Sequence, residues 1–319
     1  MPDACATPRV SIGVPVYNGA DFLEQALASI LGQTFSDFEL IVCDNASTDR
    51  TEAICRKYQA SDRRVRYVRQ ARNLGAAANY NRTFFEARGE YFKWAAHDDV
   101  LAPDFLEKCV KALDADPGLF LAHGATVLID ESGNAGSCYL DCLASDSDDP
   151  VARFRTWMER PRGQCNPAFG VLRREWMGAT GLHGNYVGAD RVLLGEYALR
   201  GRARTLWDTY LYRRIHPGIS TTANPGNLRL AQWFSGRKER GLKFKRYRQL
   251  REFARMIHRV PLSRAQRFGA WRVLLRWVFD LRSEYLKELL LPLYINGQDT
   301  PLKSWLRRQT AARKGPSAA

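Results

Sequence analysis

The chain lacks a long apolar run, a secretory leader and a regular cysteine pattern. No uninterrupted apolar stretch in its 319 residues approaches the roughly 18–20 residues that a membrane-spanning helix needs. The first eight residues are polar, which is not typical of a signal peptide. The seven cysteines are scattered and odd in number, and Cys43 falls on a predicted buried strand, so we expect reduced thiols in the cytosol. Cys138 and Cys142 have no second Cys or His pair at ligand spacing, which disfavours a structural zinc site.

Two sequence motifs are missing, and each absence disfavours a class of protein. The turn after the first predicted strand, at residues 15–20, lacks Gly-x-Gly-x-x-Gly, which disfavours a dinucleotide-binding oxidoreductase. No RNA- or DNA-binding motif is recognisable, so we expect no specific nucleic-acid partner, although a net charge of +14 keeps a basic nucleic-acid-binding protein as an alternative.

Acidic residues are scarce toward the C-terminal end, where residues 236–276 hold 14 Lys or Arg and 2 Glu. The basicity therefore belongs to a separate C-terminal element.

Apolar periodicity divides the remainder into alternating strands and helices. Strands are predicted at 9–16, 38–43, 65–69, 91–96 and 120–129, and helices at 22–31, 50–60, 76–87, 103–115 and 190–199, with short strands elsewhere in 169–215. Asp21 and Glu24 predict a capping box for the first helix, and Ser47 or Asp49 a cap for the second. This order predicts an α/β fold with a mostly parallel, doubly wound central sheet flanked by helices, followed by a basic α-helical extension.

Acidic residues follow two of the predicted strands at their C-terminal ends. Residues 40–43 lead into the polar segment Asp44 to Asp49, and residues 91–96 lead into His97-Asp98-Asp99. Open α/β sheets bind their ligands at this edge. A divalent ion that holds a nucleotide diphosphate needs carboxylate oxygens on a rigid edge, with room left for phosphate oxygens. The pattern predicts an enzyme that handles a nucleotide-activated substrate.

Four motifs in this order resemble the family 2 glycosyltransferases of GT-A fold. They are Val-Ser-Ile-Gly-Val-Pro-Val-Tyr-Asn at 10–18, Asp-Asn-Ala-Ser-Thr-Asp at 44–49, Arg-Asn-Leu-Gly at 72–75, and His-Asp-Asp at 97–99 with Pro-Asp at 103–104. The resemblance covers roughly residues 8–220 and implies a GT-A (Rossmann-like) catalytic domain at residues 1–222, which leaves residues 223–319 as the separate basic helical region. It further implies inverting transfer of a sugar from a nucleotide diphosphate-sugar, with UDP favoured, to a hydroxyl of a carbohydrate or lipid-linked acceptor in bacterial cell-surface polysaccharide or glycolipid assembly.

The resemblance also implies the residues of a nucleotide-sugar site. These are Pro15, Val16, Tyr17, Asn18, Asp44, Asn45, Ser47, Arg72, Asn73, Gly75, His97 and Asp98. In this interpretation Tyr17 faces a nucleobase, Asp44 accepts hydrogen bonds from the base, and Arg72 offers a planar fork to base or diphosphate. An ordinary Pro-containing loop is the alternative for 15–18, a structural turn is the alternative for Asn73 and Gly75, and helix capping is the alternative for Asp44.

The same resemblance implies a Mg²⁺ or Mn²⁺ ion at the acidic motif. Asp98, Asp99 and His216 are the predicted metal ligands, with His216 as a satisfied loop histidine in the alternative interpretation. The sequence departs from the family pattern at Ala96, which stands where the family has its first aspartate. Asp98 is therefore expected to be the main ligand, while His97 shapes the site.

Inverting transfer also needs a general base that takes the proton of the acceptor hydroxyl. The resemblance implies Asp190, at the start of a predicted helix, for this role, and a simple N-cap is the alternative. Ala189 stands where the family has an acidic neighbour. Because acids are missing at Ala96 and Ala189, a sugar-nucleotide-binding pseudoenzyme stays open as an alternative.

The basic C-terminal region combines cations with apolar residues at helical spacing, among them Phe253, Ile257, Leu274 and Trp277. Basic amphipathic helices with aromatic residues lie well on anionic bilayers. We therefore expect a peripheral location on the inner, cytoplasmic face of the cell membrane, close to a lipid-linked acceptor. The alternative is that the apolar faces pack on the catalytic domain and the cations are merely solvated.

Overall fold

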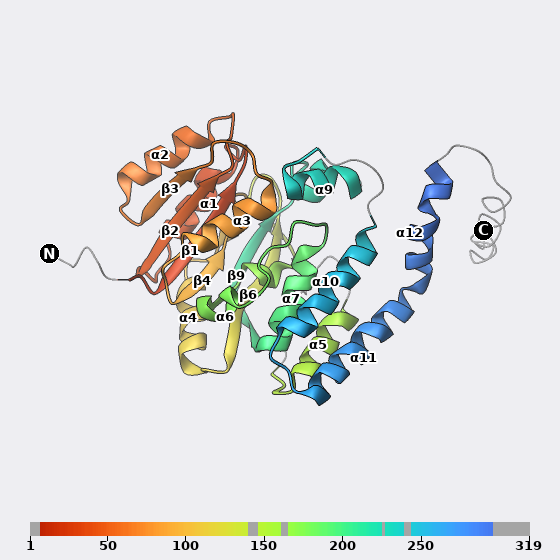
Figure 1. Cartoon of the computed structure of the whole chain (residues 1–319). Coiled ribbons are helices and arrows are strands. Elements are labelled where there is room, and N and C mark those ends of the chain that lie inside the picture. Colours follow the sequence, from red (N-terminus) through yellow and green to blue (C-terminus); the bar gives the residue numbers. More distant parts are fainter. Residues whose placement is uncertain (1–6, 140–145, 161–164, 225–226, 239–243, 296–319) are drawn as a thin grey trace, which may run out of the picture.

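The computed structural model of the chain describes residues 7–139, 146–160, 165–224, 227–238 and 244–295, so Cys142 lies outside the described residues. Within these ranges the strands form one nine-stranded sheet with helices on both faces (Figure 1). The strands are β1 Val10–Val16, β2 Phe38–Asp44, β3 Val65–Arg69, β4 Tyr91–Trp94, β5 Val100–Leu101, β6 Leu119–Ile129, β7 Ala135–Tyr139, β8 Val171–Arg173 and β9 Arg202–Arg214.

The sheet confirms the predicted, mostly parallel α/β architecture. Its strand order is β3-β2-β1-β4-β8-β6-β9-β5, with β7 paired to β6. Strands β1 to β4 pair in parallel, β8 runs antiparallel between β4 and β6, and β6 is parallel to β9. Because β1 lies between β2 and β4, the C-terminal ends of all three strands open onto one edge of the sheet. The polar motifs that follow these strands therefore meet there.

Two apolar layers hold helices to the two faces of the sheet. One layer joins inward residues of β1 and β2 to α1 Leu23–Leu31, α2 Thr51–Ser61 and α4 Phe105–Ala115. The other lies under α3 Ala76–Phe85, α5 Pro150–Glu159, α6 Arg174–Gly178 and α7 Ala189–Arg200. The short elements are η1 Asn166–Phe169, α8 Ser220–Ala223 and α9 Asn227–Ser235. Helix α7 is buried almost all round, which holds its N-terminal end firmly at the edge of the sheet.

Several local predictions are corrected. Helix α1 begins after Phe22, without a side-chain cap from Asp21, because the first turn starts from the carbonyl of Gly19, which accepts from the Phe22 and Leu23 amides. The segment 202–214 is one long strand rather than short ones, since it pairs along β6 on both sides of a bulge. Strand β4 ends at Trp94, two residues earlier than predicted.

Helix α2 is likewise not capped as the sequence suggests. Arg50 occupies its N-cap position, and neither Ser47 nor Asp49 does. Asp49, one residue before the N-cap, still accepts from the Thr51 amide at 3.0 Å. Ser47 is instead tied to the loop after β1, as the site geometry shows.

The C-terminal helices are α10 Lys245–Arg259, α11 Arg264–Asp280 and α12 Arg282–Ile295. Phe253, Ile257 and Leu274 are fully buried in the same apolar cluster as α5 and α7, so these apolar residues pack on the helices that cover the sheet. Glu196 of α7, also buried, binds Arg259 of α10 through a 2.5 Å ion pair. Among the described residues, no helix is both long and apolar enough to cross a bilayer.

Candidate active site

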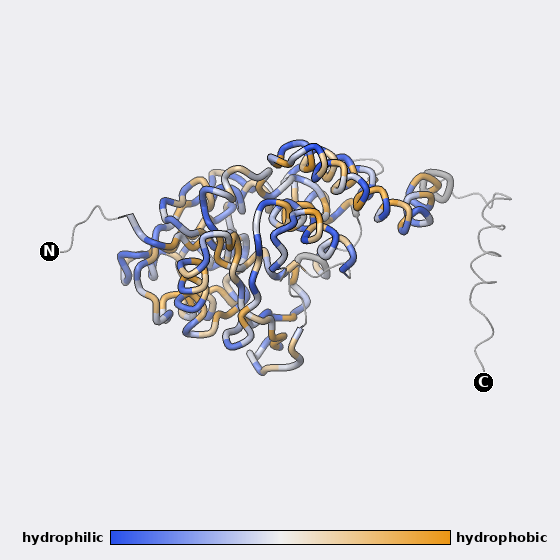
Figure 2. The backbone as a smooth tube through the Cα atoms, turned by 90° about the horizontal axis from the view of Figure 1, so that it is seen from below, coloured by the Kyte–Doolittle hydropathy of each residue, from blue (hydrophilic) through white to orange (hydrophobic). Residues whose placement is uncertain are grey.

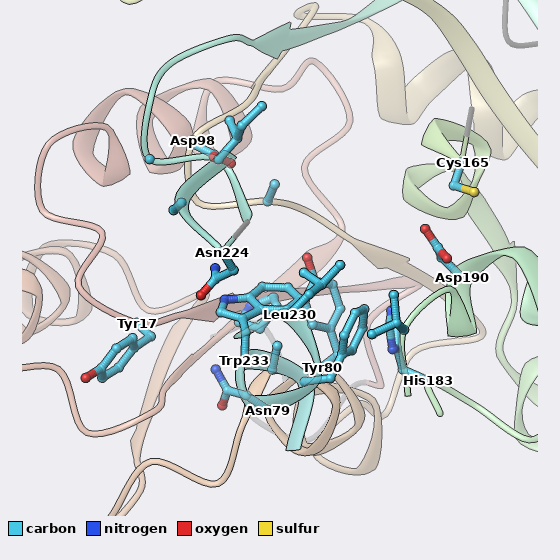
Figure 3. Close-up of a pocket in the computed structure, with 18 of the residues that line it drawn as sticks. Tyr17, Asn79, Tyr80, Asp98, Cys165, His183, Asp190, Asn224, Leu230 and Trp233 are labelled. Carbon is cyan, nitrogen blue, oxygen red and sulfur yellow. The ribbon is translucent and has the colours of Figure 1, made fainter. Parts of the chain in front are cut away.

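A pocket of about 1520 Å³ opens at the C-terminal edge of β1 and β4 and extends toward α7 and α9. Figure 3 shows Asp98 and Tyr17 toward one side of it, Asp190 and His183 beside each other on the other side, and Trp233 and Leu230 of α9 between. Eleven predicted site residues line it: Pro15, Val16, Tyr17, Asn18, Asn45, Asn73, His97, Asp98, Asp99, Asp190 and His216. Four others, Asp44, Ser47, Arg72 and Gly75, are not in its lining.

The loops after β1 and β2 are hydrogen-bonded to each other. Asn18 adopts a positive φ of 51°, and its backbone amide donates to Ser47 Oγ at 2.9 Å. In return, Asn18 Oδ1 accepts from the Thr48 amide at 2.8 Å. Tyr17, just before this contact, is 43% exposed. Ser47 thus braces the loop that presents the Tyr17 ring to the pocket.

Asp44 is fully buried behind this loop. Its Oδ1 accepts from the Ser47 amide at 2.8 Å, and its Oδ2 accepts from Tyr67 Oη at 2.7 Å and from Arg69 Nη1 at 2.6 Å. Both carboxylate oxygens are therefore engaged within the protein. Contact between Asp44 and a nucleobase stays a prediction, and it requires this set of hydrogen bonds to rearrange.

The loop before α3 is fastened to β2 by amide side chains. Asn45 Nδ2 donates to Asn73 Oδ1 at 2.9 Å, and Asn45 Oδ1 accepts from the Leu74 amide at 2.8 Å. Gly75 has a φ of 87°, and a Cβ placed there would lie 2.3 Å from the backbone nitrogen of Gly236. A glycine is required at this position because the end of α9 passes directly over it. Arg72 is exposed.

Asp98 forms the acidic side of the pocket together with His216. Its Oδ2 lies 3.0 Å from His216 Nε2, which brings the end of β4 and the loop after β9 together. Burial opposes ionisation of Asp98, but the nearby His97 and the hydrogen bond from His216 outweigh it and lower the pKa of Asp98. A charged carboxylate is therefore present here at neutral pH.

Asp99 lies deeper and has a different role in the fold. Burial, followed by repulsion from Asp98, raises the pKa of Asp99 to about 7. Its Oδ1 accepts from the backbone amide of Arg214 at 2.9 Å. The buried Arg214 guanidinium donates to the carbonyls of Asp98, Asp130 and Glu131 and to Gln25 Oε1. Asp99 and Arg214 together hold the Asp98 backbone in place.

The donor set at Asp98 fits a divalent cation bound together with a diphosphate. The residues described contain no group of three His, Cys, Asp or Glu side chains placed to hold an ion without further ligands. Mg²⁺, however, is usually held by only one or two carboxylates and completed by substrate phosphates and water. Asp98 supplies a charged oxygen that lines the pocket, and His216 lies within hydrogen-bond distance of it. These two side chains are the ones that would hold the ion, with Asp99 behind them.

Asp190 stands at the start of α7, across the pocket from Asp98. The preceding Gly188 has a φ of 82°, the left-handed turn that starts the helix, and its carbonyl accepts from Gln249 of α10 at 3.2 Å. Asp190 Oδ1 accepts from the Arg191 amide at 2.8 Å, so one carboxylate oxygen is held and the half-buried side chain stays in the pocket lining. The turn at Gly188 before Asp190 and the amide of Arg191 after it thus hold Asp190 in position.

Sequence motifs do not predict the aromatic wall of the pocket. His183 lies 5.0 Å from the ring of Tyr80 and stacks on Phe234 of α9 at 5.6 Å, and Trp94 contacts its edge. Burial lowers the pKa of His183, so its imidazole is neutral at physiological pH. The wall joins α3, the loop before α7 and α9, which are far apart in the chain. No short motif carries that signal.

Comparisons with known proteins agree with this architecture. Residues 11–134 match the family model of Glycosyl transferase family 2. An uncharacterized glycosyltransferase of Rickettsia typhi is 37% identical over 108 residues, which are 34% of this chain and 33% of the relative. The chondroitin synthase of Escherichia coli is 35% identical over 127 residues, or 40% of this chain and 18% of the relative. The matched part spans about a third or less of either relative.

Solved structures resemble the chain over a longer stretch. A crystal structure of TarS from S. aureus covers 85% of this chain and 72% of its own length, with a TM-score of 0.58 at 18% identity. The mannosyltransferase PcManGT from Pyrobaculum calidifontis covers 98% of this chain and 82% of its own length, with a TM-score of 0.53 at 20% identity. This likeness is one of fold, the GT-A fold. The family model covers residues 11–134, less than half of the chain, and this part is similar to glycosyl transferase family 2.

Proposed function

We propose that the chain is an inverting glycosyltransferase that moves a sugar from a nucleotide diphosphate-sugar, a UDP-sugar in the first instance, to an acceptor hydroxyl. One observation carries this proposal. A single pocket places the charged Asp98, with its partner His216, on one side and the Asp190 carboxylate on the other. A leaving diphosphate and an attacking hydroxyl need such opposite positions in a single displacement.

In this mechanism Asp190 takes the proton of the acceptor hydroxyl while that oxygen attacks the anomeric carbon. The new carbon–oxygen bond forms on the face opposite the diphosphate, and the bond to the diphosphate oxygen breaks with its electron pair staying on that oxygen. The configuration at the anomeric carbon is thereby inverted. A bound divalent ion would stabilise the negative charge of the departing diphosphate. His216 and the Asp98 carboxylate hold that end of the pocket in place.

The donor end is proposed at the loops after β1 and β2. Tyr17, exposed in the pocket, offers an aromatic face to the nucleobase, and Asn45 and Asn73, hydrogen-bonded to each other, line the same pocket. Arg72 lies outside the pocket lining, so its contact with a base or a diphosphate requires its exposed side chain to swing inward. TarS has been solved with UDP and with UDP-GlcNAc, and PcManGT with GDP-Man and Mn²⁺. These complexes support the donor class and divalent metal use.

For the cellular role we propose assembly of a bacterial cell-surface polysaccharide or glycolipid, with a carbohydrate or lipid-linked acceptor. The match to a chondroitin synthase supports a polysaccharide product. The chain is proposed to work at the cytoplasmic face of the cell membrane, and the basic helices from residue 244 onward support this location. The catalytic unit is proposed to be residues 1–222, with residues 223–319 as the membrane-side region.

The donor class is tested first by thermal stabilisation with UDP, GDP and dTDP, each with and without Mn²⁺. We expect a metal-dependent rise in melting temperature with UDP that Asp98→Ala abolishes. The exposed Asp208, which pairs with Lys108, provides a matched control, because Asp208→Ala removes a carboxylate away from the pocket. A shift with none of the nucleotides, in folded protein, would refute the donor proposal.

The base is tested by transfer itself. Asp190→Asn is expected to reduce the rate of UDP release by about 10²–10⁴-fold, the usual contribution of a general base. Donor-induced stabilisation should stay unchanged in this variant. Near-normal turnover in Asp190→Asn would show that another group takes the proton. Donor binding without transfer in the unaltered chain, over a broad acceptor panel, would instead identify a sugar-nucleotide-binding pseudoenzyme.

A further inference from the structure

Helix α11 is apolar on two opposite faces, and packing among the residues that the structure describes accounts for one of them. Ala270, Leu274 and Trp277 are buried and point toward α5 and α10. Gly269 also touches α5, since a Cβ there would lie 3.0 Å from Val151. This inner face fixes the rotation of α11 about its own axis. Everything on the opposite side of the helix therefore faces outward.

The outer face carries three large exposed apolar side chains. Phe268 is 66% exposed, Leu275 is 58% exposed and Phe279 is 56% exposed. At about 100° per residue these three positions fall within a sector of about 40°, and they extend along about three helical turns. Leu286 and Leu289 of α12 are exposed as well. We call Phe268, Leu275 and Phe279 the outer stripe.

Cations border the outer stripe. Arg264 and Arg272, both exposed, lie about 40° to either side of Phe268 on the helix. Arg276, exposed beside Leu275, pairs with Asp280 at 3.2 Å, and the guanidinium of Arg282, at the start of α12, lies 4.4 Å from the centroid of the Phe279 ring. Figure 2 shows the arm that α11 and α12 form toward the C-terminus, in which hydrophobic and hydrophilic residues alternate. An apolar stripe between arginines is the pattern of a helix that lies in the surface of an anionic bilayer.

From this geometry we infer that the outer stripe of α11 inserts into the headgroup region of an anionic phospholipid bilayer. The inference deepens the proposed membrane location, because it names the surface and separates it from the buried faces of α10 and α11. A second copy of the chain is a poorer occupant, since two such faces would oppose arginine with arginine. Phosphate headgroups instead pair with those arginines while the acyl region takes up the phenyl rings.

The inference predicts a division of labour within the C-terminal region. Phe253 and Ile257 of α10 are buried against the core and contribute nothing to bilayer binding in the folded chain. The outer stripe contributes to bilayer binding and little to folding, because it is exposed. Substitutions in the two sets should therefore affect different measurements.

The test is co-sedimentation of the full chain with lipid vesicles. One set contains equal parts of phosphatidylglycerol and phosphatidylcholine, and the other contains phosphatidylcholine alone. We expect binding to the anionic vesicles that falls as salt is raised. The triple variant Phe268→Ser, Leu275→Ser, Phe279→Ser should bind the anionic vesicles about a hundredfold more weakly, since three partly inserted side chains are lost.

Two controls keep the result interpretable. Phe85→Ser removes a phenyl ring that is 71% exposed at the end of α3, and it should bind like the unaltered chain. The double variant Arg264→Glu, Arg272→Glu leaves the outer stripe intact but should lose binding to anionic vesicles, so the inference stays testable even if the triple variant does not fold. Thermal stabilisation by nucleotide, measured without vesicles, should be unchanged in all variants.

Two outcomes would overturn the inference. The first is equal binding of the triple variant and Phe85→Ser to anionic vesicles. The second is absence of vesicle binding by the unaltered chain, together with self-association that the triple variant removes, which would identify a second copy as the occupant. Failure of donor binding or transfer would contradict the proposed function but leave the vesicle result standing, because the two measurements share no step.

Discussion

Lys93 of β4 is a fully buried cation close to the site, and replacing it by methionine should change the pH dependence of stability in a defined way. Its ammonium donates to the carbonyl of Phe169 in the pocket wall and lies 4.5 Å from the ring centroid of Phe105. Burial lowers the pKa of Lys93 from 10.5 to about 7. Methionine has a similar length and shape and carries no charge.

The magnitude follows from these contacts. A fall in pKa from 10.5 to about 7 corresponds to a penalty of about 4 kcal/mol for the charged side chain near neutral pH. Methionine removes this penalty but leaves the Phe169 carbonyl without its donor, at a cost of about 1–3 kcal/mol. It also loses a cation–π contact of about 1–2 kcal/mol. The Lys93→Met variant should therefore be about as stable as the unaltered chain at pH 7, or about 1 kcal/mol more stable.

The change of this stability difference with pH gives a sharper test than its value at pH 7. Between a folded pKa of about 7 and an unfolded pKa of 10.5, the unfolded chain binds more protons, so the stability of the unaltered chain rises with pH across that window. Methionine does not titrate. The advantage of the variant should shrink by about 2 kcal/mol from pH 7 to pH 9 and turn into a disadvantage.

The assay is urea unfolding of both proteins at the two pH values, in the same buffer series and at constant ionic strength. Groups other than Lys93 titrate in both proteins and cancel in the difference. A difference in unfolding free energy that is the same at pH 7 and pH 9 would refute the reasoning. It would mean that Lys93 is charged throughout the range, with Phe169 and Phe105 compensating for its burial.

Three further predictions concern the frame of the site. Burial lowers the pKa of His123 to about 4, below its unfolded value of 6.5, so stability should fall by up to about 3 kcal/mol as pH drops through that window, and His123→Asn should lack this loss in acid unfolding curves. Glu196→Ala leaves the partly buried Arg200 and Arg259 without their shared carboxylate, so the free energy of unfolding in urea should fall by about 3–5 kcal/mol. The control Glu24→Ala breaks an exposed ion pair and should lower it by less than about 1 kcal/mol. Gly75→Ala puts a Cβ against the Gly236 backbone at positive φ, so we expect a loss of at least about 1 kcal/mol in thermal unfolding and a changed tryptophan fluorescence from Trp233 of α9; an unchanged spectrum would show that α9 does not rest on this glycine.

Much of the fold could be predicted from local patterns. The strands at 10–16, 38–44 and 65–69 and the helices between them follow from short apolar periods, and their order implies a parallel sheet. Because parallel strands share one C-terminal edge, the approach of the motifs at residues 44, 73 and 98 could also be expected. The capping prediction at Asp21 was wrong, since the backbone carbonyl of Gly19 accepts from the amides of Phe22 and Leu23 and the helix begins after Phe22.

The C-terminal helices show the limit of composition. Helix α11 has apolar residues on two opposite faces, and judged by composition either face suits a core or a bilayer. Only the packing of Phe253 and Leu274 against α5 and α7 decides which face is inside. The rotation of a helix about its axis is fixed by the partner it contacts, and that partner is more than fifty positions away in the chain.

What the sequence by itself determined is the resemblance of its N-terminal part to the family 2 glycosyltransferases, the α/β order of elements and the acidic residues at the sheet edge, because each depends on neighbours along the chain. Tertiary structure alone decided which carboxylates face the pocket. Asp44 ends one strand and Asp98 follows another, yet Tyr67 and Arg69 bind Asp44 in the interior, and His216 contacts Asp98 at the pocket. A carboxylate takes its role from the donors around it, and those donors come from strands and loops that meet only in the folded chain.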